Sequence, residues 1–287
     1  MLALGILAAV GASVLYNTSI ALQAIEVREV PAEHSLRVSL IGRLLRNRRW
    51  LGATALGLIG WPLEIVALLL APLTVVQPCL ASGLVVLLWL GATKLGEAPG
   101  RREYVAVAAI VAGVAGVALA APERTTDHAD TAAIALALAL VALPIAAPYL
   151  LRGRGAVAAG TIAVVSAGFG YAWTAIASKL LTDELVAGSV LVAVAWLATA
   201  AASEGLALLS EMSALQRRAA THVAPVMFAV QVLVPVALAP LIFGESWSQT
   251  PLNGAVLIAF MAVAVIGTTL LAGSRAVGAV LESAHKE

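Results

Sequence analysis

Nine apolar segments of about 20 residues each follow one another along this chain, separated by mostly short polar connections. A helix of ~20 apolar residues crosses the ~30 Å hydrocarbon core of a bilayer at about 1.5 Å per residue. The segments are expected at 2–24, 51–71, 73–92, 104–121, 131–150, 157–179, 187–209, 222–243 and 252–272. We therefore predict an all-α integral membrane protein with nine transmembrane helices.

The positively charged residues predict the orientation of these segments. If the N-terminus lies outside, fifteen of the 17 Lys and Arg residues fall in cytoplasmic connections, and only Arg124 and Lys179 face out. Lys and Arg accumulate in the cytoplasmic loops of membrane proteins. The fifteen are Arg28, Arg37, Arg43, Arg46, Arg48, Arg49, Lys94, Arg101, Arg102, Arg152, Arg154, Arg217, Arg218, Arg275 and Lys286. We predict a multi-pass protein of the cell (inner) membrane with an external N-terminus and a cytoplasmic C-terminus.

The composition excludes an ordinary water-soluble domain. The chain is 61% hydrophobic and 11% charged, with a mean hydropathy of +0.99, whereas soluble domains carry about 25% charged residues. A net charge of +1 offers no overall basic surface for nucleic acid. The single cysteine, Cys79, cannot form an internal disulfide. The first segment lacks a basic leader, so we interpret it as a retained span.

The stretch from residue 26 to residue 50 is the most polar connection. Within it, leucines recur at helical spacing beside arginines: Leu36, Leu40, Leu44 and Leu45 with Arg37, Arg43 and Arg46. This pattern predicts a cytoplasmic amphipathic helix that lies on the inner leaflet, with its arginines toward anionic headgroups.

An internal repeat organises the chain. Gly96-Glu97 closes one span before a polar turn and a span rich in small residues, and Gly244-Glu245 does the same. Val76-Gln77-Pro78 lies 19 residues before the first glutamate, and Val223-Ala224-Pro225 lies 20 residues before the second. Spans 1–4 therefore correspond to spans 6–9, and the copies have opposite orientations because five spans separate them. Inverted repeats of this kind are typical of secondary transporters with a site near the midplane.

The repeat predicts four regions. Residues 1–121 form the first repeat, 122–156 a connecting fifth span, 157–272 the second repeat and 273–287 a cytoplasmic tail. Small residues are expected to let helices approach closely on spans 4 and 6. They are Ala109, Ala112, Gly113, Gly116 and Val117 on span 4, and Ser166, Gly168 and Gly170 on span 6.

Polar residues within the apolar segments are the candidates for a substrate site. A carboxylate at the centre of a membrane helix costs on the order of 2.5–3.5 kcal/mol, so Glu64 on span 2 and Glu204 on span 7 are functional candidates. Because these spans are repeat mates, the two carboxylates are expected to flank one cavity and to exchange protons. The alternative is a neutral glutamate that only bonds a neighbouring helix. The other predicted substrate-binding residues are Tyr16, Asn17, Trp61, Gln77, Tyr171, Trp173 and Gln231.

Enzyme signatures do not occur in the sequence. It contains no HExxH, nucleophile elbow, phosphate loop or aspartate-rich lipid-phosphate motif. We therefore predict no catalytic residue and no cofactor.

Several short motifs resemble the drug/metabolite transporter (EamA-like) superfamily, and within it the NIPA-type magnesium-transporter branch. They are Ala71-Pro72, Val76-Gln77-Pro78, Glu97, Ala121-Pro122, Ser178-Lys179 and Val223-Ala224-Pro225. The resemblance covers roughly residues 10–272, and it implies nine spans with an external N-terminus. The branch carries Gly-Glu-x-x-Asn in its second span, whereas this chain reads Gly60-Trp61-Pro62-Leu63-Glu64. The acid is displaced by one helical turn, so Glu64 is the expected ligand if a divalent cation is carried.

We expect a secondary membrane transporter that moves a small solute by alternating access through a cavity between the repeats, with proton coupling as one form of it. Two alternatives stay open: a magnesium or other divalent-cation transporter, and a non-transporting membrane scaffold or accessory subunit. The expected partners are the lipid bilayer and a small solute or cation. A homodimer is one further option, and nucleic acid is not expected.

Overall fold

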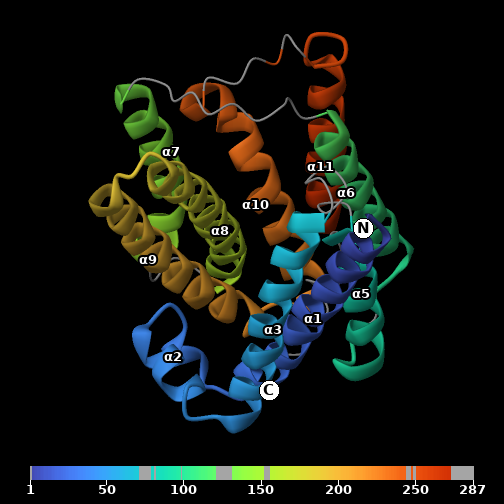
Figure 1. The fold of residues 1–287 in the computed structure, drawn as a ribbon. Helices are drawn as coiled ribbons and strands as arrows, with labels where there is room; N and C mark the ends of the chain where they lie inside the picture. The colour runs from blue at the N-terminus through green and yellow to red at the C-terminus, as the bar shows by residue number, and fades with distance from the viewer. Residues whose placement is uncertain are drawn as a thin grey trace.

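The computed structural model describes residues 2–70, 79–80, 82–97, 99–120, 131–151, 156–243, 247 and 250–272. In this part of the chain all regular structure is helical and no strand occurs. The helices are α1 (Leu2–Arg28), the short 3₁₀ helix η1 (Ala32–His34), α2 (Val38–Leu44), α3 (Arg48–Leu70), α5 (Gly83–Lys94), α6 (Arg101–Ala120), α7 (Thr131–Leu150), α8 (Ala156–Val186), α9 (Val190–Leu215), α10 (Ala220–Phe243) and α11 (Ala255–Ala272) (Figure 1).

The long helices coincide with the apolar segments of the sequence. Alanine and leucine favour helix, and a backbone surrounded by lipid must satisfy its hydrogen bonds internally. Four described stretches are long and apolar enough to cross a bilayer: Ala3–Arg28, Gly160–Ser178, Val190–Leu215 and Ala220–Leu238. Shorter apolar helices cover Gly83–Lys94, Ile134–Leu150 and Ala255–Leu270. The all-α class is confirmed, and several of the helices suit a membrane.

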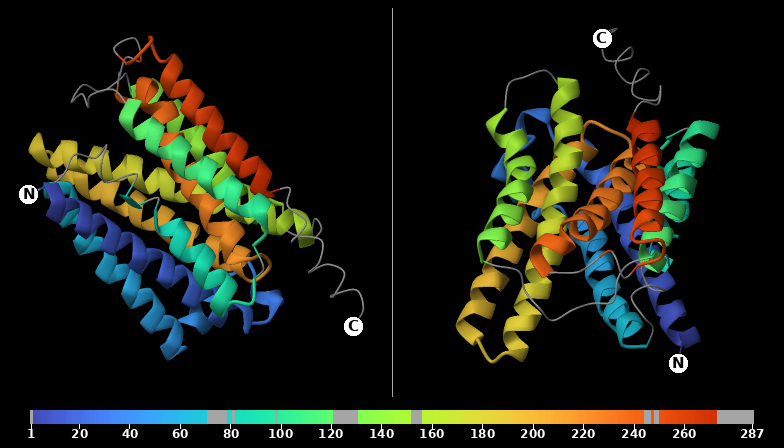
Figure 2. Two further views of the ribbon diagram at one scale, coloured as in Figure 1. Left: turned by 90° about the vertical axis from the view of Figure 1, so that its right-hand side faces the viewer. Right: turned by 90° about the horizontal axis from the view of Figure 1, so that it is seen from above.

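The helices pack mainly as antiparallel pairs. In the α1–α3 pair, Gln23 bonds Thr54 at 2.9 Å and Tyr16 bonds Glu64 at 2.6 Å, so the two helices run in opposite directions. The α8–α9 pair has the same sense, because Ser166 contacts Ser210 and Thr174 contacts the Ala200 carbonyl. A third pair joins α6 to α11, and α10 lies centrally between the pairs (Figures 1 and 2).

Close approach of these pairs depends on small residues. A side chain at Gly113 of α6 would place its Cβ 2.6 Å from the backbone nitrogen of Ala264 in α11. At Gly170 of α8 the Cβ would lie 2.7 Å from that of Ala207 in α9. Gly168 faces Val230 of α10 in the same way. The small-residue contacts predicted for spans 4 and 6 are therefore confirmed.

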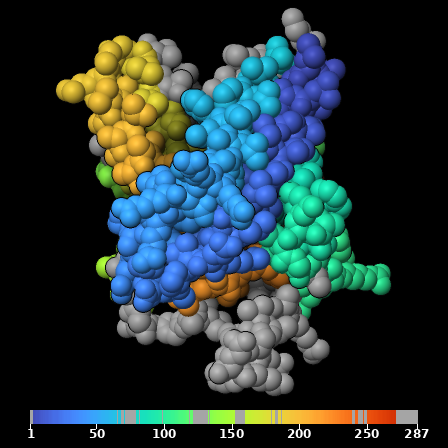
Figure 3. All heavy atoms as spheres, turned by 90° about the horizontal axis from the view of Figure 1, so that it is seen from below, coloured from blue at the N-terminus to red at the C-terminus, as the bar shows by residue number. Residues whose placement is uncertain are grey.

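The connection between α1 and α3 differs from the expectation. Three of its four leucines are buried in the protein core: Leu36, Leu40 and Leu44 belong to the same cluster as Met212 and Leu215 at the end of α9, whereas Leu45 is 55% exposed. The amphipathic pattern of residues 26–50 is thus used to pack α2 (Figure 3), whereas we predicted an apolar face lying on the inner leaflet. The leucines pack on protein rather than on the membrane surface because the apolar end of α9 lies directly beside this connection.

Candidate functional site

A notch separates the α8–α9 pair from the α1–α3 pair at one end of the molecule. Figure 3 shows it between α9 and α3, and Figure 2 shows these helices spreading apart toward the α8–α9 turn. In this half of α9, Ala200 and Ser203 are buried against α8 while most other positions are exposed. Among the described residues, no hydrogen bond or ion pair joins 190–206 to 2–16 or 58–70. In the described part of the chain, the notch is therefore open at this end.

The opposite end of the notch is closed by contacts between the same two halves. The Trp50 indole Nε1 donates to the sulfur of Met212 at 3.4 Å, and Trp50 is fully buried. The Gln216 amide donates to the Val30 carbonyl at 3.0 Å. The backbone N–H of Leu36 donates to the Ser213 hydroxyl at 2.8 Å, across 177 positions of sequence. These bonds tie the end of α9 to the α1–α3 connection.

An ionic cluster strengthens the closed end. Glu97, between α5 and α6, accepts a hydrogen bond from Arg28 at 2.5 Å. It also accepts bonds from the backbone N–H groups of Ala220 and Thr221 at 2.8 and 3.0 Å and from the Thr221 hydroxyl at 2.7 Å. Glu97 therefore caps the first turn of α10, where unpaired N–H groups and the helix dipole favour a negative charge. We call this set, Arg28, Glu97, Ala220 and Thr221, the latch.

The latch sets the charge state of its carboxylate. Burial by itself raises the pKa of Glu97, but the hydrogen bonds from Arg28, Thr221 and Ala220 outweigh burial and hold that pKa below its usual range. Glu97 is therefore ionised at neutral pH, which is the form that can accept all four bonds.

Two of the predicted site residues meet beside the notch. The Tyr16 hydroxyl of α1 donates to Oε2 of Glu64 on α3 at 2.6 Å. The tyrosine ring reaches this position because Gly60 has no side chain: a Cβ there would lie 2.9 Å from the ring. Glu64 and Tyr16 are both partly exposed. Solvent or a solute entering at the open end can reach them.

A second tyrosine–glutamate pair is more buried. The sequence analysis predicted its tyrosine, Tyr171, but missed its glutamate, Glu211. The Tyr171 hydroxyl of α8 donates to Oε2 of Glu211 on α9 at 2.5 Å. Glu211 is only 3% exposed, and its other oxygen, Oε1, is buried without a hydrogen-bond partner. The pair lies next to Met212 and Ser213, whose contacts close the notch.

A sequence signal for Glu211 exists. Glu211 follows Glu64 by 147 positions, and Val223 follows Val76 by the same 147 positions. The register of the Val-x-Pro elements therefore matches Glu64 with Glu211. We had predicted Glu204 as its mate, from helix order alone.

Glu204 occupies a different place on α9. It is exposed, and its charge acts on Tyr171 of α8 and also on Tyr16 of α1. A side-chain hydrogen bond with Thr174 of α8 also acts on Glu204. Glu204 and Glu211 are seven residues apart, about 10 Å along the helix axis. That Glu204 and Glu64 flank one cavity stays a prediction.

The other predicted site residues lie in different surroundings. Asn17 is buried and donates to the Ser13 carbonyl at 2.9 Å, in the contact where α5 crosses α1 at Gly83. Trp61 is 63% exposed on α3, one turn before Glu64.

Trp173 packs into a separate apolar cluster with Ile176, Leu180 and Ile242, away from the two tyrosine–glutamate pairs. Its indole Nε1 is buried without a partner. Gln231 is partly buried on α10. Gln77 lies outside the described residues.

A metal centre made of protein side chains is not found in the described part of the chain. No group of three or more His, Cys, Asp or Glu residues there is arranged to hold an ion. Glu64 has Tyr16 as its bonded neighbour, so a cation at Glu64 would keep most of its ligands as water or draw them from the backbone.

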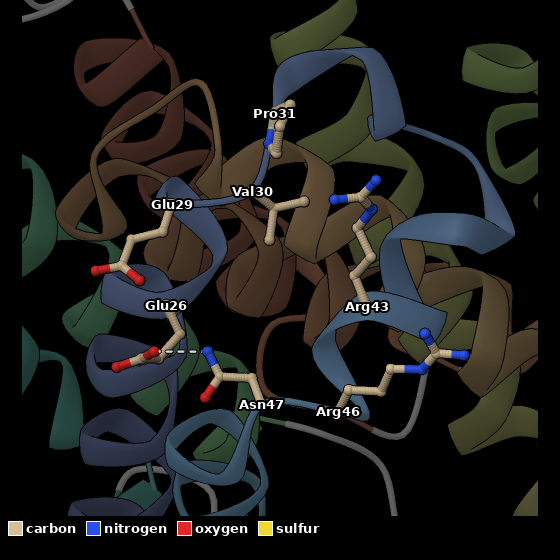
Figure 4. Close-up of a pocket in the computed structure, with 7 residues that line it drawn as sticks. All are labelled: Glu26, Glu29, Val30, Pro31, Arg43, Arg46 and Asn47. Atoms are coloured by element: carbon tan, nitrogen blue, oxygen red, sulfur yellow. Dashed lines mark hydrogen bonds between the residues drawn. The ribbon is translucent and has the colours of Figure 1, made fainter.

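A shallow pocket of about 550 Å³ lies on the closed end (Figure 4). Glu26 of α1 and the two residues just after that helix, Glu29 and Val30, line one side, and Arg43 and Arg46 line the other. Asn47 donates to Glu26 at 2.7 Å across its floor. The pocket is open and lies outside the notch.

Comparison with known proteins adds no relative: no family model, no curated protein and no solved structure matches this chain.

Proposed function

We propose that this protein is a secondary transporter of the cell (inner) membrane that moves a small solute by alternating access. The observation that carries the proposal is the notch. It lies between α3 and α9, the helices that carry Glu64 and Glu204 (Figure 3), and hydrogen bonds and the latch close its other end. A site open to one side only is what alternating access requires of each of its two states.

The helix pairing supports nine spans in two inverted repeats. α1 packs on α3 and α5, and α8 packs on α9 and α10, which are the corresponding positions of the second repeat. The fourth helices of the two repeats, α6 and α11, cross each other antiparallel at Gly113 and Gly267. Membership of the drug/metabolite transporter superfamily fits this arrangement and rests on the short motifs of the sequence.

The charge distribution supports an outward-open state. Arg43 of α2 and Arg46 just after it lie at the closed end (Figure 4), and Arg28 and Arg218 lie there too. Arginine-rich connections face the cytoplasm. The closed end is then cytoplasmic, and the notch opens to the outside.

The notch favours a cationic solute. Glu64 and Glu204 have no ion pair among the described residues, and Tyr16 adds an oxygen at the same place. Carboxylates in a low-dielectric cavity attract positive charge strongly. The exposed indole of Trp61 offers a ring face that binds an organic cation.

Reconstituted liposomes test this function. Purified protein is placed in vesicles that hold either a pH-sensitive or a magnesium-sensitive dye, and a pH gradient, a magnesium gradient or a panel of small organic amines is applied. We expect amine uptake that responds to the pH gradient and ignores the magnesium gradient. Flux that follows magnesium alone would favour the second candidate, a divalent-cation carrier whose oxygen ligands start with Glu64 and Tyr16.

A third candidate is a non-transporting scaffold or accessory subunit. For a scaffold, none of these probes moves in vesicles that contain folded protein. Glu64→Gln would then leave the cellular phenotype intact, while substitution of Gly113 at the α6–α11 contact would not.

A further inference from the structure

The two tyrosine–glutamate pairs have the same construction. In each, a tyrosine from the first helix of a helix pair donates its hydroxyl to Oε2 of a glutamate on the second helix. The distances are 2.6 Å for Tyr16 to Glu64 and 2.5 Å for Tyr171 to Glu211. Both helix pairs are antiparallel and pack tightly through small residues, at Gly60 in one and Gly170 in the other.

The two pairs lie at opposite ends of the notch, because the helices that carry their glutamates run in opposite directions. Glu64 belongs to the C-terminal part of α3, which reaches the open end, and it is partly exposed. Glu211 belongs to the last turns of α9, which reach the closed end, and it is almost fully buried. The two sites therefore differ in exposure although they share one construction. Their glutamates lie 147 positions apart in the sequence and their tyrosines 155.

We propose that Tyr171 and Glu211 form a second proton-binding site, the inverted counterpart of Tyr16 and Glu64, which opens to the cytoplasm when the notch closes to the outside. This inference rests on the proposed function, because it assumes that the two halves rock. Inverted repeats exchange their conformations between the two access states, so the exposure of the two glutamates exchanges as well.

The surroundings of Glu211 suit a bound proton. A buried carboxylate is costly unless a cation or several donors compensate it. The titratable groups that act on Glu211 are Tyr171 from α8, a single donor, and Glu204 from α9 itself, which is also an acid. Helices α1, α2, α7 and α10 also contact α9, and within the described chain none of them gives Glu211 an ion-pair partner or a further donor. The neutral acid is the form that fits this site.

Opening of the closed end would release that proton. The residues on either side of Glu211, Ser210 and Met212, are held by Tyr149 and Trp50. Loss of the Trp50–Met212, Leu36–Ser213 and latch contacts would admit water to Glu211, and a hydrated carboxyl ionises at cytoplasmic pH. The proton moves from the Glu211 carboxyl to water, and Tyr171 remains as the donor to the resulting carboxylate.

Chemical coupling on the native chain tests the exchange. A water-soluble carbodiimide and taurine are added to one side of oriented vesicles, and mass spectrometry reads the coupling at Glu64, Glu204 and Glu211. The taurine nitrogen forms an amide with the carboxyl carbon, and the carbodiimide takes up the released water as a urea. In the wild type we expect coupling at Glu64 and Glu204 from the outer side, and at least tenfold less at Glu211 from either side.

Weakening the latch should reverse this pattern. In Glu97→Gln we expect coupling at Glu211 from the cytoplasmic side to rise several-fold, and coupling at Glu64 from the outer side to fall. Thr221→Val, which removes one bond of the latch, should do the same to a smaller extent and serves if Glu97→Gln does not fold. Glu33→Gln is the control, because Glu33 is exposed and pairs only with His34 in the described structure. The inference would be overturned if taurine coupling at Glu64 and Glu211 changed in the same direction, or changed at neither residue.

Dicyclohexylcarbodiimide, which adds to protonated carboxyls in apolar surroundings, tests the proton itself. We expect it to modify Glu211 in the wild type and to do so several-fold less in Glu97→Gln, where water enters. If dicyclohexylcarbodiimide modifies Glu211 in neither protein, the claim that Glu211 holds a proton is contradicted. Liposome flux separates the proposed transport from the exchange of exposure between Glu64 and Glu211. Solute flux without opposite changes in the modification of the two glutamates contradicts this inference alone. Opposite changes in modification without flux of any probe contradict transport alone.

Discussion

The carboxylate of Glu97 and the hydroxyl of Thr221 lie 2.7 Å apart, although 124 positions of sequence separate them. This contact joins the end of α5 in the first half of the chain to the first turn of α10 in the second. Gly91 makes the approach possible, since a side chain there would collide with the methyl group of Thr221. The latch is therefore a direct bond between the two proposed repeats.

Removing the latch charge should destabilise the protein. Glu97→Gln loses the ion pair with Arg28 and weakens three bonds to α10. Because hydrogen bonds to a charged group are worth about 1.5–3 kcal/mol each and an amide replaces them in part, we expect a loss of about 2 kcal/mol and a Tm lower by several degrees. Thermal unfolding in detergent measures this. Glu33→Gln, at an exposed site of the same end, should leave Tm unchanged.

Acidification should produce the same effect through the wild-type side chain. The folded-state pKa of Glu97 is held below its usual range by Arg28, Thr221 and Ala220, against the effect of burial. The stabilisation by Glu97 is therefore complete above the ordinary glutamate pKa of about 4.3, and it disappears as the pH falls through the lower folded value. Tm measured from pH 7 down to pH 3 should fall more steeply in the wild type than in Glu97→Gln. Parallel curves for the two proteins would contradict the role of Glu97.

Glu64→Gln should abolish gradient-driven transport but leave folding intact. The glutamine side chain keeps the shape of a neutral glutamate, and its amide oxygen can still accept the Tyr16 hydroxyl bond. Flux of the organic amine panel in liposomes and Tm in detergent measure the two effects separately. Glu204→Gln should be milder, because Glu204 is exposed and bonds neither tyrosine. Normal gradient-driven flux in Glu64→Gln would leave Glu64 a structural hydrogen-bond partner.

Adding one methyl group to the α6–α11 contact should be costly. At Gly113 the new Cβ would lie 2.6 Å from a backbone nitrogen and 2.8 Å from the Phe260 carbonyl oxygen, so the helices must separate. We expect Gly113→Ala to cost about 1–3 kcal/mol, as overpacking does. The matched control is Gly205→Ala on α9, where a Cβ meets nothing within 4 Å. That change should be neutral or slightly stabilising because alanine favours helix, and both are read from Tm.

Thiol labelling should establish the orientation. In a Cys79→Ser background, Arg48→Cys lies at the closed end beside α2 and Ala187→Cys lies in the turn between α8 and α9. An impermeant maleimide added to intact cells should label position 187 and spare position 48. The reverse result would invert the proposed topology and make the notch open to the cytoplasm.

Much of this architecture follows from the sequence alone. The alternation of apolar segments with polar connections predicts where helices begin and end, because lipid and core alike demand internally bonded apolar backbone. The paired glycines of α6 and α8 predict close packing correctly, since only small residues let helices touch. Glu64 and Tyr16 were predicted as site residues because polar groups at membrane depth are costly, and the structure shows that they bond each other.

Other features were decided only by the tertiary structure. Helix order made Glu204 the predicted mate of Glu64, but the rotation of α9 against α8 turns Glu211 to Tyr171 and leaves Glu204 exposed. The leucines of α2 were predicted to lie on a membrane surface, but in the structure they pack on the end of α9. The latch depends on Arg28, Glu97 and Thr221 meeting from three distant segments. Helical periodicity describes one helix at a time, whereas each of these contacts depends on the relative rotation and translation of two or three helices, which packing alone determines.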